Sequence, residues 1–211
     1  MNHDADNRGA APTEEKQAMR IGELLILAGL WMLFGFMIWY YTSPWHGLPV
    51  RWLSEQALSL TLGDSFYNII ANPDRAYLFQ VQTKILFSFP DGTREPLGFI
   101  VNPLVYGYGL PLLLGLMMAT EQPLWRKLMV MLVGYGVILL VQVWGVYWQC
   151  LKTLSFNFGN EAAAVVAESG MPEPMIALCY QLGVLILPAL APVVVWVLGN
   201  WREVEHFIQQ R

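Results

Sequence analysis

The chain has 211 residues, of which 55% are hydrophobic and only 13% are charged, and its formal net charge is −4. Because a soluble domain usually carries about 25% charged residues, we expect lipid to be the solvent for much of this chain. The small negative charge and the lack of a Lys/Arg-rich run argue against nucleic acid as a partner.

Four apolar runs are long enough to cross a hydrocarbon core of ~30 Å, which needs roughly 20 residues. We predict transmembrane helices at 21–42, 102–119, 128–149 and 176–198. The first run is longer than the roughly 7–15 residues of a signal-peptide core, and no small-residue cleavage site follows it. We therefore interpret it as a retained anchor.

The distribution of Lys and Arg predicts the orientation. Seven of these residues lie in the three short segments 1–20, 120–127 and 199–211, and five are spread over the longer intervals 43–101 and 150–175. The positive-inside rule then places both termini in the cytoplasm and both longer intervals outside it.

The interval 43–101 begins with a helical pattern, in which Trp52, Leu53, Gln56 and Leu60 form a stripe. Such an amphipathic helix is expected to lie on the membrane surface or to pack on its own domain, and the pattern does not separate these alternatives.

A period-two pattern over residues 77–89 then predicts a strand, and the segment Pro90-Asp91-Gly92 supplies a turn. Residues 93–101 return as the second strand of a hairpin. Since an isolated hairpin is only marginally stable, its apolar face must cover a helix, the 150–175 interval, the bilayer surface or a partner. The candidate contact residues on that face are Phe79, Val81 and Phe99. The interval 150–175 itself is expected to hold a short helix, with Asn160 as its cap and Gly170 at its end.

The second span opens with the sequence VNPLVYGYGLP, residues 101–111. We predict Asn102 as the N-cap and Pro103 as the first helical residue, where its missing N–H has no cost. Pro111 then falls inside the helix and predicts a kink, which Gly107 at i−4 tolerates. Gly109 offers close helix contact.

Pro188 disturbs the fourth span in the same way. The two disturbed helices either enclose a cavity between them or bend around their neighbours, and the sequence leaves both alternatives open.

Reactive groups are scarce in the predicted spans. Their central parts contain no Asp, Glu, Lys or Arg, which argues against an ion-driven transporter. We expect Gln142 to form an interhelical hydrogen bond. No pattern predicts a metal site or a cofactor. Cys150 and Cys179 are interpreted first as inert thiols and second as a disulfide on the oxidising side, with catalysis far behind.

In order and composition the chain resembles the exosortase H-associated membrane proteins, an accessory family of the bacterial exosortase protein-sorting systems. The resemblance covers about residues 20–200: one anchor, an outer segment ending in a hairpin, the run VNPLVYGYGLPLLLGLMMA, and two further spans. It implies a multi-pass protein of the bacterial inner membrane with an exosortase as partner. The exosortases resemble Cys/Arg/His catalysts, and Cys150 and Cys179 lack a matching Arg and His, so the resemblance does not carry catalysis to this chain.

These observations predict a mainly α membrane protein of four transmembrane helices, with a small extracytoplasmic α+β element that contains a β-hairpin. The expected function is that of a non-enzymatic accessory or scaffold protein whose partners are membrane lipid and another membrane protein. The alternative is a lipid- or small-molecule-handling protein with a cavity between the kinked second and fourth spans. A membrane cysteine enzyme is a third hypothesis.

Overall fold

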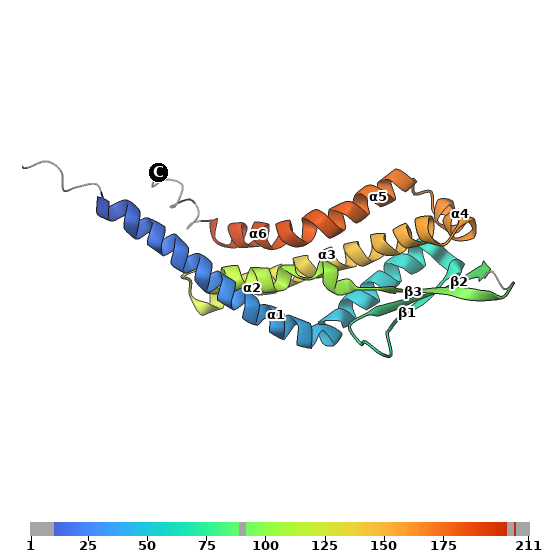
Figure 1. Ribbon diagram of the computed structural model, residues 1–211, viewed down its shortest axis with the longest axis horizontal. Helices are drawn as coiled ribbons and strands as arrows, with labels where there is room; N and C mark the ends of the chain where they lie inside the picture. The colour runs from blue at the N-terminus through green and yellow to red at the C-terminus, as the bar shows by residue number, and fades with distance from the viewer. Residues whose placement is uncertain (1–10, 89–91, 202–204, 206–211) are drawn as a thin grey trace, which may run out of the picture.

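The computed structural model describes residues 11–88, 92–201 and 205. It is mainly helical, with one small sheet (Figure 1). Along the chain the elements are α1 (Ala11–Leu62), η1 (Gly63–Ser65), β1 (Phe66–Ala71), β2 (Phe79–Ser88), β3 (Arg94–Val101), η2 (Pro103–Tyr106), α2 (Gly109–Ala119), α3 (Leu124–Asn157), α4 (Asn160–Glu168), α5 (Glu173–Gln181), η3 (Leu182–Ile186) and α6 (Leu187–Gly199).

The molecule is elongated, with the sheet and α4 at one end and the start of α1 and the end of α6 at the other (Figure 1). Within the described residues three helical stretches are long and apolar enough to cross a membrane, at Leu25–Ser65, Leu124–Asn157 and Glu173–Gly199. The expected second span, predicted at 102–119, corresponds to Pro103–Ala119, which is apolar but shorter. The Arg126 guanidinium donates a hydrogen bond of 3.0 Å to the Gly199 carbonyl, which holds the start of α3 beside the end of α6.

The anchor and the amphipathic helix are one continuous helix, α1, which changes direction about midway (Figure 1). Pro44 and Pro49 lie inside it, where sequence reasoning placed the end of the anchor. Pro44 has no N–H for the Tyr40 carbonyl four residues earlier, and the Ser43 hydroxyl donates to that carbonyl at 2.6 Å instead. The freed carbonyl is thus satisfied, so the helix bends and continues.

The outer half of α1 packs on the rest of the molecule with a different face from the predicted one. Val50, Ser54 and Leu58 are completely buried. Of the predicted stripe, Trp52 is 61% exposed and Leu60 is 88% exposed. The stripe was therefore wrong as a packing face, because Ser54, a small polar residue, interrupts the true one.

The prediction of a single helix at 102–119 is wrong. The segment consists of the 3₁₀ turn η2, a two-residue turn, and the 11-residue helix α2. Pro111 stands third in α2, where its missing N–H has no intrahelical acceptor, so it helps to begin this helix and does not kink a longer one. The Gly107 carbonyl accepts from the Leu110 N–H at 3.1 Å.

The fourth span contains a π-helical turn, η3, between α5 and α6. Pro188 is the second residue of α6, two positions after the end of η3. An α-helix would require an N–H at this position for the Val184 carbonyl, which lies within η3. The wider turn thus accommodates the proline that the sequence marked as a disturbance.

The predicted hairpin is confirmed as β2 and β3, in which Phe79 pairs with Val101 and Val81 pairs with Phe99. Pro90 and Asp91 lie outside the described residues, and Gly92 has the positive φ of 86° expected of it. A third strand, β1, completes an antiparallel sheet in the order β1-β2-β3. Sequence reasoning missed β1 because a register shift between Phe66 and Asn68 breaks its alternation.

One face of the sheet builds the core of the outer element. Phe79, Val81 and Phe99 are buried in a cluster that also contains Leu58 of α1 and Leu151 of α3. The first three residues therefore belong to the interior and do not face a partner. The Thr61 and Tyr147 hydroxyls share a hydrogen bond of 2.8 Å, which ties the outer half of α1 to α3.

Candidate functional site

The turn from the sheet into α2 packs tightly against α3. Tyr106 is buried, and its hydroxyl donates a hydrogen bond of 2.8 Å to Gln149 Oε1. Its ring lies on Gly145, where an added Cβ would overlap the ring atoms. A residue other than glycine at this position of α3 would displace the whole turn.

Gln142 makes the predicted interhelical hydrogen bond. Its side chain is only 2% exposed, and Nε2 donates to the Pro103 carbonyl at 3.3 Å. A 3₁₀ turn bonds each carbonyl to the N–H three residues later, so the Gln142 amide adds a second donor to the Pro103 carbonyl. A Cβ on Gly107 would overlap the Gln142 amide, which explains the glycine at this place.

Asn102 caps η2 as predicted, because its Oδ1 accepts from the Leu104 N–H at 3.1 Å. Pro103 follows at the first position of the turn. Of the residues proposed from VNPLVYGYGLP, Pro103 and Gly107 thus lie at Gln142 of α3, whereas Gly109 and Pro111 contact α6 and α1. Gly145 was not singled out in the sequence, because its partner Tyr106 lies 39 positions earlier and no local pattern connects the two.

The second and fourth spans meet directly at Gly109. A Cβ there would lie 2.8 Å from the Pro188 carbonyl oxygen and 3.3 Å from the Pro192 ring. The two helices that carry the prolines therefore pack backbone to backbone at this point. A pocket that the structure contains lies between α1, α2 and α3 instead.

Cys150 and Cys179 are both free thiols. Cys150 is completely buried in the core cluster, and the Cys179 carbonyl accepts a hydrogen bond of 3.0 Å from the Trp144 indole. No group of three or more metal-ligating side chains occurs among the residues that the structure describes.

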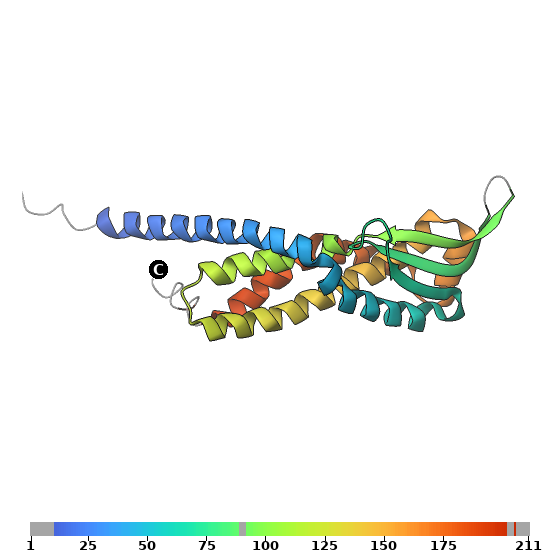
Figure 2. The same ribbon diagram turned by 90° about the horizontal axis from the view of Figure 1, so that it is seen from below.

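The sheet turns its second face outward, and Figure 2 shows the sheet in front of α3 and α4. None of the eleven residues on this face is buried, and Ile100 is 55% exposed. Two of them are charged, Lys84 and Arg94, and Arg94 lies at the far end of the hairpin from Ile100. We call this surface the open sheet face; it consists of Asn68, Ile70, Gln80, Gln82, Lys84, Leu86, Ser88, Arg94, Pro96, Gly98 and Ile100.

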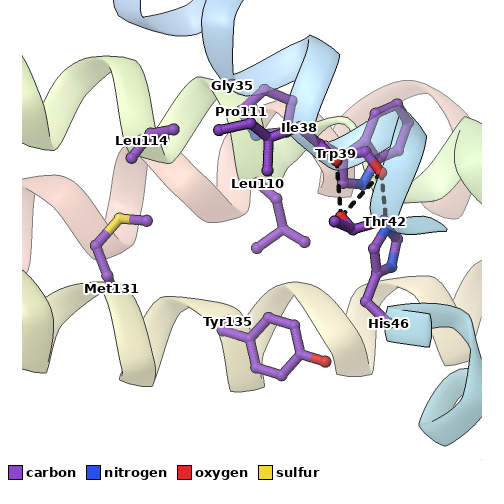
Figure 3. Close-up of a pocket in the computed structure, with 10 residues that line it drawn as sticks. All are labelled: Gly35, Ile38, Trp39, Thr42, His46, Leu110, Pro111, Leu114, Met131 and Tyr135. Atoms are coloured by element: carbon purple, nitrogen blue, oxygen red, sulfur yellow. Dashed lines mark hydrogen bonds between the residues drawn. The ribbon is translucent and has the colours of Figure 1, made fainter.

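A pocket of ≈ 200 Å³ lies between α1, α2 and α3, within the membrane-spanning part of the molecule. Figure 3 shows Trp39, Thr42 and His46 gathered at one end, with Leu114 and Met131 at the opposite end. The His46 ring stacks on Trp39, with ring centroids 6.0 Å apart, and His46 Nε2 lies 3.2 Å from the Trp39 carbonyl oxygen. Sequence reasoning missed this pocket because three separate segments form it.

Apolar helices long enough to cross a membrane, joined to a small three-stranded sheet, define the class: an integral membrane protein. The model of one family, described as exosortase H-associated membrane protein, matches residues 18–203. The chain therefore belongs to the exosortase H-associated membrane proteins. No curated protein matches the chain. No solved structure matches it either.

Proposed function

We propose that this protein is a non-enzymatic accessory subunit that holds a membrane partner, an exosortase, through the open sheet face. The proposal places it in the bacterial inner membrane with four spans and both termini in the cytoplasm. The observation that carries it is the composition of that face.

An antiparallel sheet with one buried face normally turns polar and charged residues to water on the other. Here the paired row Ile70, Gln80 and Ile100 crosses all three strands, and Leu86 pairs with Pro96 nearby. Depletion of charge around exposed aliphatic side chains is typical of the central part of a protein–protein interface. The face therefore fits a protein surface better than it fits water.

The packing of α2 supports its assignment as a membrane span, the second of four along the chain. Gly115 lies against α1, since its Cβ would meet the Ala28 carbonyl oxygen at 2.6 Å. Leu113 and Met117 are completely buried beside Ile138 of α3. Such a helix is shielded by longer neighbours, which allows a stretch of 17 residues to serve as an inner span.

The absence of enzymatic activity is supported by the surroundings of Cys150. Because this thiol is completely buried among apolar side chains, it does not meet a substrate in this conformation. Reactive cysteines are instead partly exposed and lie near positive charge.

The experiment is co-purification of the tagged protein with the exosortase of the same cell in mild detergent. A stoichiometric complex that Ile100→Glu weakens is the expected result, because the new charge would be buried without a partner. Leu60→Glu is the control, since Leu60 is 88% exposed on α1 and is not part of the open sheet face. If only Leu60→Glu loses the complex, the contact lies on α1 and not on the open sheet face. If the wild-type protein retains no exosortase, the proposal is wrong.

A further inference from the structure

The β1–β2 ladder shows to which side each β2 residue turns its backbone groups. The Asn72 N–H donates a hydrogen bond of 2.9 Å to the Leu78 carbonyl, in the same register as the paired residues of the two strands. Hydrogen-bonded pairs recur at every second residue of an antiparallel ladder, and the N–H and C=O of one residue point to the same side. Gln80 therefore also bonds to β1, whereas Phe79 and Val81 bond to β3.

Two residues of β3 consequently have unused backbone groups. Phe99 and Val101 are the partners of the two β2 residues that face β3, so they exchange hydrogen bonds with β2. Gly98 and Ile100 alternate with them, and their N–H and C=O groups point away from β2, off the edge of the sheet. Both residues are exposed, and outside the ladder no backbone group of the described residues bonds to them. The edge of β3 thus presents two donors and two acceptors.

This stretch of edge lacks the features that usually prevent the addition of another strand, namely charges, prolines and a covering element. The opposite edge strand, β1, lies beside the outer half of α1 (Figure 2). Toward the tip of the hairpin, β3 carries Arg94, Glu95 and Pro96. Residues 97–101 contain neither a charge nor a proline. The half of β3 that leads into the apolar segment Pro103–Ala119 is therefore open to another strand.

The contacts within the chain do not require a glycine at position 98. Gly98 does not have a positive φ, and an added Cβ would meet only the Val81 carbonyl oxygen, at an ordinary contact distance of 3.5 Å. The register shift of the hairpin adds its extra residues to β2, between Gln82 and Leu86. Glycine inside a strand weakens it, and one of its known uses is the close approach of another backbone. A strand beside β3 supplies such a backbone.

We propose that an extended segment of the membrane partner adds to β3 as a fourth strand, along Gly98 and Ile100. This inference rests on the proposed function and states in which form the exosortase engages this part of the molecule. Main-chain hydrogen bonds to the two donors and two acceptors hold the segment, and alternate side chains provide the selectivity. An apolar side chain fits on the open sheet face beside Ile100, which is 55% exposed.

The direction of β3 limits what this segment is. β3 lies lengthwise along the molecule, as α3 does (Figures 1 and 2). In the proposed orientation the added strand is upright on the membrane, so it is an extended stretch directly outside a membrane span of the partner. A second copy of this chain does not fit, because identical edges related by a twofold axis pair antiparallel. Two copies inserted in the same orientation have parallel β3 strands.

The first test compares two substitutions of Gly98 in the full-length protein, by its affinity for the exosortase of the same cell in mild detergent. Gly98→Pro removes one outward N–H and leaves the bonds to β2 intact, since proline is tolerated on an edge strand where its N–H faces outward. The dissociation constant should rise about threefold to tenfold, as expected for one neutral hydrogen bond. Gly98→Ala keeps the N–H and is the matched control, which should bind more tightly than Gly98→Pro.

The second test needs no variant. Amide hydrogen exchange of the wild-type protein is measured at single residues by fragmentation mass spectrometry, with and without the exosortase. The amides of Gly98 and Ile100 should exchange rapidly in the free protein and at least about tenfold more slowly in the complex, because strand pairing gives each N–H a carbonyl acceptor. The amides of Phe99 and Val101, which already bond to β2, should be protected in both states.

The outcomes separate this inference from the proposed function. A complex that Ile100→Glu weakens, but in which Gly98→Pro binds like the wild type and the amides of Gly98 and Ile100 exchange as in the free protein, retains the contact through the open sheet face and excludes strand addition. If the wild-type protein retains no exosortase, both proposals are wrong.

Discussion

Gly145 and Gly136 lie on the same helix, α3, but a methyl group would meet different surroundings at each. At Gly145 it would overlap the buried Tyr106 ring, and at Gly136 no atom lies within 4 Å. We expect Gly145→Ala to lower stability by about 1–3 kcal/mol, as overpacking of a well-packed core usually does. Gly136→Ala is the matched control and should leave stability unchanged or slightly higher.

The measurement is the midpoint of thermal unfolding in one detergent, followed by tryptophan fluorescence for both variants and the wild type. Equal midpoints for the two variants would show that the turn at Tyr106 can move away from Gly145 without a loss of stability, which would contradict the close packing at this position.

At this scale the sequence predicts side chains whose role is local. Asn102 and Pro103 could be assigned because a cap and a first-turn proline act on their own backbone. Gln142 could be assigned a hydrogen bond, since a polar group in lipid requires a partner, although the Pro103 carbonyl could not be named as that partner. Trp39 and His46 were beyond prediction as residues that line a pocket, because the pocket also requires α2 and α3.

The starts of two elements differ in how their backbone N–H groups are satisfied. Asn102 accepts from the Leu104 N–H, whereas Asn160, predicted as a cap, is the first residue of α4 and follows the true N-cap, Gly159. We expect Asn102→Ala to cost about 0.5–2 kcal/mol, the usual range for a lost cap. Asn160→Ala should cost much less, because no side-chain cap bond is lost there.

Chemical denaturation in mixed micelles provides the comparison of the two alanine variants. A larger loss with Asn160→Ala than with Asn102→Ala would reverse this assignment of the caps.

Prediction of the elements succeeded where the pattern was regular. The period-two alternation gave β2 and β3, and their pairing buries the residues that the alternation placed on one face. Prolines led to two opposite errors in the prediction of helices. α1 passes through Pro44 and Pro49, while the helix predicted at 102–119 around Pro111 is divided into η2 and α2. The rule for proline states which hydrogen bond is lost, and only the tertiary structure shows whether another donor replaces it.

On the scale of the whole molecule, β2 and the segment between α2 and α3 lie at opposite ends (Figure 1). Ser88 ends β2 and Glu121 lies in that segment, and both are exposed. We expect Ser88→Cys to react with a membrane-impermeant maleimide in intact spheroplasts, because the positive-inside rule places the sheet outside. Glu121→Cys should react only after lysis. Both variants are made with Cys179→Ser, and the buried Cys150 is retained.

The reaction of each cysteine is read by mass shift before and after permeabilisation. Labelling of Glu121→Cys alone in intact spheroplasts would invert the orientation and would move the open sheet face to the cytoplasm.

The length of α3 has a consequence for how a partner approaches. Its 34 residues extend ~51 Å, which exceeds the ~30 Å hydrocarbon core by ~20 Å. In the orientation proposed above, the sheet and α4 pack on the protruding part, so the number of residues in this one helix would set their distance from the bilayer surface. The length of α3 would thus fix the distance from the bilayer surface at which a docking protein has to place its own contact surface.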